Sequence, residues 1–514
     1  MYSEVITAIV RGIESIPVHV EVDVSNGMPV FDMVGSLSGE VREAKERVRT
    51  ALRNCEVLLP AKRITVNMTP ADLKKTGAGF DLPIAIAVLQ AMGMVKREKT
   101  EDAMIIGQLA LSGELLPVEG ILPVVAAAKE QNMKRCIVPK ASRREAEFVS
   151  GVEVIALGHL REVIAYLNGE LELFDEKIKK EKAVEKQQEQ VDFSDINGQH
   201  LMKRACEVAV SGMHNILLVG PPGAGKTMAA KRIATILPPM NEEEKMELAK
   251  IYSVSGMFDK WCQRQDERPF RSPHHTISEQ GLAGGGVYPK PGEISLAHRG
   301  VLFLDELTEF HKGTLEILRQ PLEDKNIRVS RVSGTVQYPC DFVLVAAMNP
   351  CNCGYYPNRN LCRCTRPLLN RYLSKLSQPL LDRIDLNVQI SKLEYGELTG
   401  VEQNETSAQI RSRVIQVHKI QKERFRGSGI FFNSQMNTRQ IKKWCQLDKK
   451  MTDYMQEMYE RLNLSARSYH KILKVARTLA DMDGAEWITE KHLNEALCYR
   501  GLDRSFWRLD ETWC

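Results

Sequence analysis

The chain has 514 residues, of which 43% are hydrophobic and 26% are charged, and its formal net charge is +4. This length exceeds what one ordinary hydrophobic core serves, so we expect about two to four domains. The composition is that of a soluble globular protein. The small positive charge permits nucleic acid as a partner but does not demand it.

The sequence contains no apparent targeting segment or membrane span. The N-terminal stretch MYSEVITAIVRGIESI carries acids at Glu4 and Glu14 and has no basic start, unlike a signal peptide. The longest apolar run, DLPIAIAVLQAMGMV from Asp81, is too short and too interrupted to cross a bilayer. We therefore expect a cytoplasmic protein without membrane contact, in which most of the 12 cysteines are reduced thiols or metal ligands.

Composition divides the chain into three structured segments and a linker. Residues 1–173 alternate short β-rich runs such as PVHVEVDV with helical stretches, which predicts an α/β domain. Residues 174–191 are dense in Lys, Glu and Gln and predict a charged linker. Residues 192–392 show a second α/β pattern, and residues 393–514 show helical periodicity with almost no strand signal. The class is therefore multidomain α/β with a C-terminal helical part.

The stretch NILLVGPPGAGKTMAAKRIA has the P-loop pattern in its required context, an apolar strand, a glycine-rich loop and a helix. Its glycines let backbone N–H groups curl around phosphates, Lys226 reaches the β and γ oxygens, and Thr227 is expected to ligate Mg²⁺. A chance glycine-rich turn does not explain this context. We expect ATP and Mg²⁺ as cofactors, held by Gly220, Pro221, Pro222, Gly223, Ala224, Gly225, Lys226, Thr227 and, further along the chain, Asp305.

Polar side chains end two later apolar strands. The strand in GVLFLDEL ends in Asp305 and Glu306, which we expect to hold Mg²⁺ and to polarise the attacking water, respectively. The strand in DFVLVAAMNP ends in Asn349, whose amide can hydrogen-bond that water or the γ-phosphate. Helix capping by the acids and turn capping by Asn349 are the alternatives. Beside a P-loop, the catalytic interpretation predicts ATP hydrolysis.

Four cysteines follow Asn349 in the stretch CNCGYYPNRNLCRC. The C-x-C-x₈-C-x-C spacing lets two short knuckles supply the thiolates of Cys351, Cys353, Cys362 and Cys364 to one tetrahedral zinc ion. A loop with so little apolar material gains rigidity from a metal. Four free thiols are the alternative, because C-x₂-C is the more usual spacing of structural zinc sites.

Taken together, GPPGAGKT, LFLDE, the Asn349 position, LLDRID and the C-terminal helices resemble an AAA+ ATPase. The stretch RPFRSPHHTISEQGLAGGGVYPKPGEISLAHRGVLFLDEL further resembles the magnesium-chelatase-like group, and within it the YifB/ComM family, over the whole chain. The resemblance implies a homohexameric ring. It also implies an ATP-driven helicase that migrates branched DNA during recombination of incoming single strands in natural transformation, with recombination proteins as further partners.

The resemblance also implies roles for four arginines. Arg383 in LLDRID would be an arginine finger that enters the neighbouring subunit's site, and Arg467 in LSARSYHKIL a second sensor of the γ-phosphate. The stretch NIRVSRVSGTVQYP alternates around Ser333-Gly334 and predicts a β-hairpin, on which Arg328 and Arg331 would grip DNA phosphates. Ordinary surface or salt-bridged arginines are the alternatives.

The N-terminal domain resembles the ribosomal-protein-S5-like fold shared with Lon protease. The stretches KKTGAGFDLPIAIAVL and GQLALSGELLPVEGILPVVAAAKE correspond to those that carry the serine and lysine of that protease. Here Gly79 stands at the nucleophile's place, and Ile121-Leu122-Pro123 near the lysine's. We therefore expect no serine–lysine proteolysis.

Two other functions share the same ATPase core. One is a magnesium-chelatase motor subunit that acts on a porphyrin-inserting partner, and the other is a protein-remodelling ATPase whose N-terminal domain binds its substrate. Stimulation of ATP hydrolysis by DNA separates the helicase from both.

Overall fold

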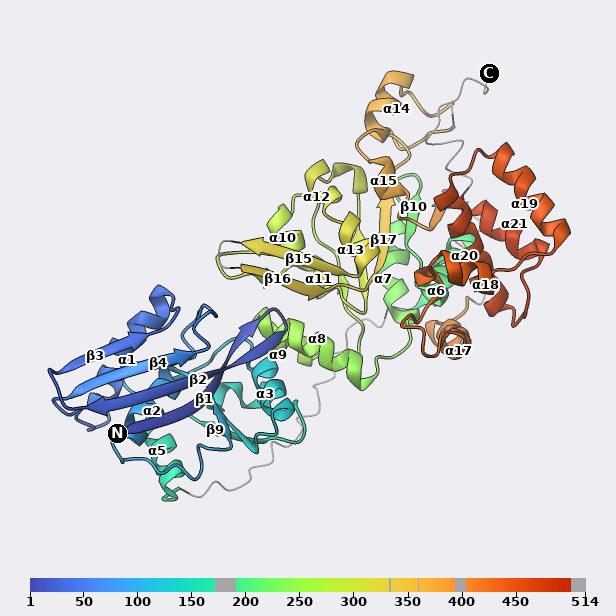
Figure 1. The fold of residues 1–514 in the computed structure, drawn as a ribbon. Coiled ribbons are helices and arrows are strands. Elements are labelled where there is room, and N and C mark those ends of the chain that lie inside the picture. The colour runs from blue at the N-terminus through green and yellow to red at the C-terminus, as the bar shows by residue number, and fades with distance from the viewer. Residues whose placement is uncertain (172–190, 332–333, 359, 393–403, 501–514) are drawn as a thin grey trace. The chain divides into compact units, whose positions relative to one another are not determined.

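The structure is a computed structural model that describes residues 1–171, 191–331, 334–358, 360–392 and 404–500. Most of the predicted linker and Ser333 of the predicted turn lie outside these ranges. The chain divides into two compact units, each with its own core (Figure 1). The first comprises Met1–Glu185 and Lys245–Gln265, and the second comprises Lys186–Glu244 and Asp266–Cys514. In the parts of the chain just given, no helix combines the length and apolar character needed to cross a bilayer.

The first unit is built on a seven-stranded sheet in the order β3-β4-β2-β1-β5-β8-β9. Strands β1 and β2 pair antiparallel, whereas β1 with β5, β5 with β8, and β8 with β9 pair parallel. The strands of this sheet are β1 (Tyr2–Arg11), β2 (Glu14–Ser25), β3 (Val30–Val34), β4 (Arg63–Thr69), β5 (Ala103–Ile105), β8 (Arg135–Pro139) and β9 (Glu153–Leu157). Strands β6 (Gln108–Leu109) and β7 (Leu115–Leu116) form a separate antiparallel pair. The helices are α1 (Gly39–Asn54), α2 (Asp81–Ala91), α3 (Ile121–Glu130), α4 (Arg143–Ala146) and α5 (Leu160–Asn168).

Helix α2 explains the longest apolar run of the sequence. Every residue from Asp81 to Ala91 is buried, which is the environment that a helix apolar on all sides requires. The one charge in its first turn, Asp81, is paired with Arg47 of α1 at 2.8 Å. The run is therefore the central core helix of this unit.

Helices α8 (Glu242–Val254) and α9 (Phe258–Cys262) place most of their residues in the first unit, although the sequence pattern assigned this stretch to the ATPase core. The aromatic rings explain this placement. Phe148 of the N-terminal segment meets the rings of Phe258 and Trp261 at centroid distances of 5.8 and 5.6 Å. The hydroxyl of Ser253 also donates to the carboxylate of Glu145. Residues 245–265 thus complete the core of a unit that begins at the N-terminus.

The second unit is built on a parallel five-stranded sheet in the order β11-β14-β17-β10-β18. Its strands are β10 (Ile216–Val219), β11 (Phe270–Arg271), β14 (Val301–Leu304), β17 (Val343–Met348) and β18 (Leu386–Gln389). All residues of β10, β14 and β17 are buried, as expected for a parallel sheet covered on both faces. Val219 lies opposite Met348, and Leu304 lies opposite Ala346, so these three strands end side by side.

Helices and small hairpins surround this sheet. They are α6 (His200–Gly212), α7 (Lys226–Ile236), α10 (Glu279–Ala283), α11 (Glu293–Leu296), α12 (Lys312–Glu316), α13 (Arg319–Asp324), α14 (Arg366–Leu373) and α15 (Gln378–Leu381), with hairpins β12 (Gly284–Gly285)/β13 (Lys290–Pro291) and β15 (Asn326–Arg331)/β16 (Gly334–Pro339). The C-terminal helices are α17 (Ser407–Arg424), α18 (Thr438–Trp444), α19 (Lys449–Arg461), α20 (Ala466–Met482) and α21 (Glu490–Cys498). Their buried residues share one hydrophobic core with the sheet. The predicted fold class is confirmed.

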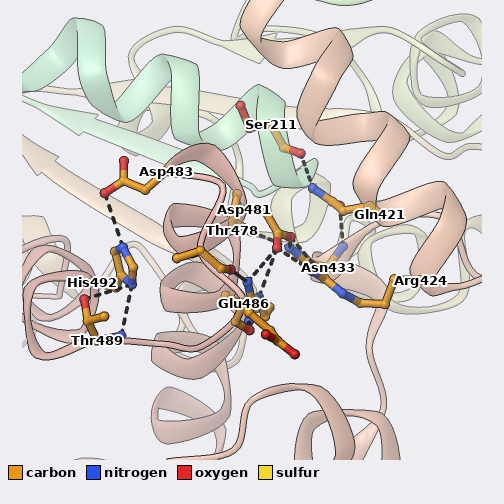
Figure 2. Close-up of polar contacts among 12 residues, drawn as sticks. Ser211, Gln421, Arg424, Asn433, Thr478, Asp481, Asp483, Glu486, Thr489 and His492 are labelled. Atoms are coloured by element: carbon orange, nitrogen blue, oxygen red, sulfur yellow. Dashed lines mark hydrogen bonds and ion pairs between the residues drawn. The ribbon is translucent and has the colours of Figure 1, made fainter.

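A buried polar network ties α17 and α20 to α6 (Figure 2). The side-chain amide of Gln421 donates to the carbonyl of Ser211 at 2.7 Å, and its oxygen accepts the backbone N–H of Asn433 at 2.9 Å. The amide of Asn433 and the guanidinium of Arg424 then donate to Asp481 at 2.8 and 2.6 Å. Breaking such a buried pair costs about 3–5 kcal/mol. The network therefore fixes α17 and α20 against α6, which packs on the five-stranded sheet.

We expect acid to destabilise this junction through His418 of α17. Burial lowers the pKa of His418 to about 4, although its Nε2 lies 3.0 Å from the carbonyl of Val210 on α6. The unfolded chain binds this proton near the ordinary pKa of 6.5, so the free energy of unfolding falls as pH drops from about 6.5 to about 4, by up to about 3 kcal/mol. His418→Asn removes the basic nitrogen and should flatten this part of the curve.

Urea midpoints at pH 7, 6 and 5 measure the effect. Substitution of the exposed His311 by Asn is the control, and it should leave the fall in urea midpoint from pH 7 to pH 5 unchanged. Equal acid sensitivity in the wild-type protein and in His418→Asn would contradict the assignment.

Candidate nucleotide-binding site

The P-loop joins the buried strand β10 to helix α7. Two of its positions, Gly220 and Gly225, require glycine for different structural reasons. Gly225 caps the helix with φ of 86°, in the left-handed region that favours glycine. A Cβ on Gly220 would lie 2.6 Å from the carbonyl oxygen of Ile390, so only glycine allows the loop to pass the end of β18. Both glycines are therefore required by the path of the loop between β10 and α7.

Lys226 is the most constrained residue of the site. Its side chain is buried, and Nζ donates to the carbonyls of Gly220 and Pro221 at 2.6 and 2.9 Å and to Oδ1 of Asn349 at 3.1 Å. Burial lowers the pKa of Lys226, while the nearby carboxylates of Asp305 and Glu306 act in the opposite direction. The ammonium therefore already lies between the P-loop and the residue predicted to sense the γ-phosphate.

Thr227 and Asp305 are adjacent although 78 positions separate them in sequence. The Thr227 hydroxyl donates to Oδ2 of Asp305 at 2.7 Å, and Oδ1 of Asp305 accepts the backbone N–H of Glu306 at 2.9 Å. A hydroxyl and a carboxylate are the hard oxygen ligands that Mg²⁺ prefers. This pair fits a magnesium ion bound together with nucleotide phosphates.

Glu306 is the most exposed of the acidic candidates, with 59% of its side chain accessible. Its backbone adopts a left-handed conformation with φ of 50°, and its carboxylate lies 3.6 Å from Nδ1 of His275. Nothing in the sequence pairs His275 with Glu306, so this partner was not predicted. His275 is placed to orient the Glu306 carboxylate.

Asn349 is held by a residue that sequence reasoning also missed. The hydroxyl of Tyr372, on α14, donates to the backbone carbonyl of Asn349 at 3.1 Å and accepts from Thr308 at 2.8 Å. Burial raises the pKa of Tyr372 to about 12, so the phenol keeps its proton. Nothing in the sequence around RYLSK distinguishes this tyrosine from an ordinary core residue.

Arg383 and Arg467 contact other parts of the chain. Nη2 of Arg383 lies 2.6 Å from Glu323, and its Nη1 donates to the carbonyl of Pro379. Arg467, whose side chain is 66% exposed, has Nη1 3.9 Å from the carboxylate of Asp382. Within one chain the structure thus brings these two arginines to the same short segment and gives both of them partners there.

The neighbouring Asp385 anchors that segment to the C-terminal helices. Its carboxylate lies 3.1 Å from Nζ of Lys471 on α20 and 3.7 Å from the ring of His214. Although burial opposes ionisation, Lys471 and His214 hold the pKa of Asp385 well below its usual range. Burial also lowers the pKa of Lys471 to about 8, in opposition to Asp385. The candidate finger segment is therefore fixed to α20, the helix that carries Arg467 in its first turn.

The predicted hairpin is confirmed over its described residues. Strands β15 and β16 pair antiparallel, and both Arg328 and Arg331 are exposed. The hairpin β12/β13 lies beside them, because a Cβ on Gly285 would be 2.8 Å from Nη2 of Arg331. The hydroxyl of Tyr338 also donates to the carbonyl of Pro289 at 2.5 Å.

The four predicted cysteine ligands converge. All their sulfur atoms lie within 4.8 Å of one another, in the group formed by Cys351, Cys353, Cys362 and Cys364.

In the first unit, Gly79 stands against apolar side chains, since a Cβ there would lie 3.2 Å from Ile106 and 3.3 Å from Val118.

A P-loop at the carboxyl end of a parallel sheet, with an acidic pair and a polar residue ending neighbouring strands, defines an AAA+ ATPase. The family model described as magnesium chelatase, subunit ChlI matches residues 192–398. The models for subunit ChlI of Mg-chelatase and for the ChlI C-terminal part match residues 20–142 and 404–500.

Known proteins match nearly the whole chain. Competence protein ComM of Haemophilus influenzae is 43% identical over 504 residues, 97% of each chain. The YifB protein of Escherichia coli is 42% identical over 498 residues, 96% of each chain. Lon protease 2 of Bacillus subtilis is 28% identical over 212 residues, 39% of this chain and 33% of that protein. The chain therefore belongs to the YifB/ComM family of magnesium-chelatase-like AAA+ ATPases, which implies ATPase activity with ATP and Mg²⁺.

We expect Tyr372→Phe to slow ATP hydrolysis without preventing nucleotide binding. The substitution removes the hydroxyl that holds the Asn349 carbonyl and keeps the ring. Loss of one hydrogen bond of about 1 kcal/mol predicts that kcat falls about fivefold.

Steady-state hydrolysis and titration with a fluorescent ATP analogue separate the two effects. Tyr355→Phe is the matched control, because it removes the hydroxyl of an exposed tyrosine, and it should behave as wild type. An unchanged kcat in Tyr372→Phe would refute the positioning role of this hydroxyl.

Proposed function

We propose that this protein is an ATP-driven DNA helicase that promotes branch migration during homologous recombination of incoming single-stranded DNA. The observation that carries the proposal is the ATP site itself, in which Lys226 bonds to Asn349 and Thr227 bonds to Asp305. Similarity to a competence protein over 97% of the chain supports the coupling of this site to DNA.

The residues of one subunit bind ATP and prepare the water. The P-loop N–H groups and Lys226 take the phosphates, so that phosphate oxygens replace the carbonyls to which Nζ now donates. Thr227 and Asp305 hold Mg²⁺, which neutralises charge on the β and γ phosphates when bound. Asn349 orients a water, and Glu306 accepts its proton as the water oxygen bonds to the γ-phosphorus and the bond to ADP breaks.

The neighbouring subunit completes the site. In a ring of identical subunits, Arg383 exchanges its partner Glu323 for the γ-phosphate of the adjacent site and stabilises charge in the transition state. Arg467 acts as the second sensor from the C-terminal helices. Arg383 lies on the segment of Asp385 and Arg467 lies on α20 with Lys471, so the Asp385–Lys471 ion pair couples nucleotide state to helix position. We propose a hexamer as the working ring.

The hairpin β15/β16 contacts DNA. Exposed Arg328 and Arg331 supply positive charge that binds phosphates without reading sequence, as a translocating motor requires. Single-stranded and branched DNA are the proposed substrates, and recombination proteins are further partners.

We expect DNA to stimulate ATP hydrolysis. Rates are measured for the purified protein with and without single-stranded and branched DNA. Glu306→Gln should lower the rate by about 10²- to 10⁴-fold in every condition, because it removes the general base. The double variant Arg328→Ala/Arg331→Ala should lose stimulation and reduce the salt dependence of single-strand binding by about 0.7 in slope per arginine.

Arg439→Ala/Lys442→Ala, at two exposed positions of α18, also removes two positive charges, so it is the charge-matched control and should retain the stimulation. Hydrolysis that is indifferent to DNA would refute the helicase function. It would favour a magnesium-chelatase motor subunit or a protein-remodelling ATPase, the alternatives with the same core.

We also expect two inactive variants to complement each other if Arg383 acts on the neighbouring subunit. Arg383→Ala should lower kcat by about 10³-fold or more, and Lys226→Ala should abolish nucleotide binding. In mixed rings, an Arg383→Ala subunit supplies an intact ATP site and a Lys226→Ala subunit supplies the finger. The mixture should therefore hydrolyse ATP faster than the sum of the separate variants.

A mixture of Lys226→Ala with Glu306→Gln is the control, because both defects lie in the same subunit's site and no interface is complete. If the mixture of Arg383→Ala and Lys226→Ala hydrolyses ATP no faster than the separate variants, Arg383 does not act between subunits.

A further inference from the structure

We propose that Cys351, Cys353, Cys362 and Cys364 bind one structural zinc ion that braces the P-loop and Asn349 of the same subunit. The cysteine loop is defined here as residues 351–354 and 362–364. The inference rests on the proposed ATP site. It adds that the geometry of this site depends on a zinc ion as well as on Mg²⁺.

The sulfur geometry fits one tetrahedral metal ion. The sulfur of Cys351 lies 3.3 Å from that of Cys353 and 3.8 Å from that of Cys362, and the sulfurs of Cys353 and Cys362 are 3.5 Å apart. Four thiolates about 2.3 Å from a central zinc are separated by about 3.8 Å. The separations of these three thiols therefore differ by about 0.5 Å or less from the tetrahedral value, and the sulfur of Cys364 lies within 4.8 Å of each of them.

Thiolate ligands select the metal. Soft sulfur donors prefer zinc over Mg²⁺, which takes oxygen ligands, so this site is chemically distinct from the Thr227–Asp305 pair. The exposed Arg363 and Arg366 provide positive charge close to the thiolates along the chain.

The cysteine loop has few other means to hold its shape. Between Met348 and Arg366, the described residues form no helix or strand. Cys351 is 1% exposed, while the other three ligands are partly exposed. A metal ion supplies folding free energy where apolar burial does not.

The loop touches the P-loop directly. A Cβ on Gly354 would lie 2.6 Å from Cδ and 3.2 Å from Cγ of Pro222. The backbone of the cysteine loop therefore packs on the ring of a P-loop residue with no space for a side chain between them.

A second connection runs along the chain. Cys351 follows Asn349 by two positions, and the side chain of Asn349 accepts a hydrogen bond from Lys226. Fixing Cys351 to a metal fixes the end of β17 from which Asn349 projects. The metal thus constrains the ATP site through Pro222 on one side and Asn349 on the other.

The first experiment measures metal content by mass spectrometry on the full-length protein. We expect about one zinc ion per chain in the wild-type protein and in Cys498→Ser, an exposed cysteine that serves as control. We expect its loss in Cys351→Ser/Cys362→Ser. Fewer than about half an equivalent in the wild-type protein, or unchanged zinc in the double variant, overturns the site.

The second experiment tests the bracing with the thiols intact. Gly354→Ala forces a methyl group against Pro222, and we expect it to retain zinc but to weaken binding of a fluorescent ATP analogue by about tenfold. Gly427→Ala is the control, because that glycine has a similar φ of 75° and no atom within 4 Å of the added methyl. Zinc retention also reports that the Gly354→Ala loop is folded.

Wild-type affinity in Gly354→Ala overturns the bracing even if zinc is present. Both experiments are performed without DNA. Loss of the helicase function therefore leaves their outcome unchanged, and loss of the zinc inference leaves DNA stimulation unchanged.

Discussion

The ATPase unit depends on the placement of one buried ammonium group. Lys226 donates to two carbonyls of its own loop and to Asn349, which ends a different strand. An unpaired charge at this depth is costly, so each acceptor must be held in place. The parallel register does this by ending β10 and β17 side by side. The register of β10 with β17 and the Asn349 amide together satisfy this requirement.

The C-terminal helices are also held in place by buried charges that need partners. Asp385 is buried between Lys471 and His214, and Arg424 and Asp481 form a second buried pair. Buried ion pairs contribute little net stability, but they penalise any arrangement that separates the partners. The helices and the sheet are therefore held in one specific arrangement. A shift of α20 would carry the segment of Arg383 with it.

The features that could be predicted from the sequence are those that form a repeating pattern or follow from the order of the strands. The P-loop, the Asp305–Glu306 pair and Asn349 each end or follow an apolar strand, and parallel strands bring such ends together. The hairpin of Arg328 was predictable from alternation alone. Tyr372, His275 and the contact of Gly354 with Pro222 were not, because each depends on how an irregular loop returns to the sheet. Residues 245–265 were missed for a similar reason, since their aromatic residues look like any core segment until Phe148 is found beside them.

The insertion of residues 245–265 into the first unit sets the order in which the chain matures. Phe148 emerges from the ribosome about a hundred residues before Phe258 and Trp261, the rings that cover it. The first unit therefore waits, with an apolar surface open, until β10 and the P-loop have already been synthesised. Neither unit is an independent gene segment, since a cut at Glu185 removes part of one core and leaves an orphan pair of helices in the other.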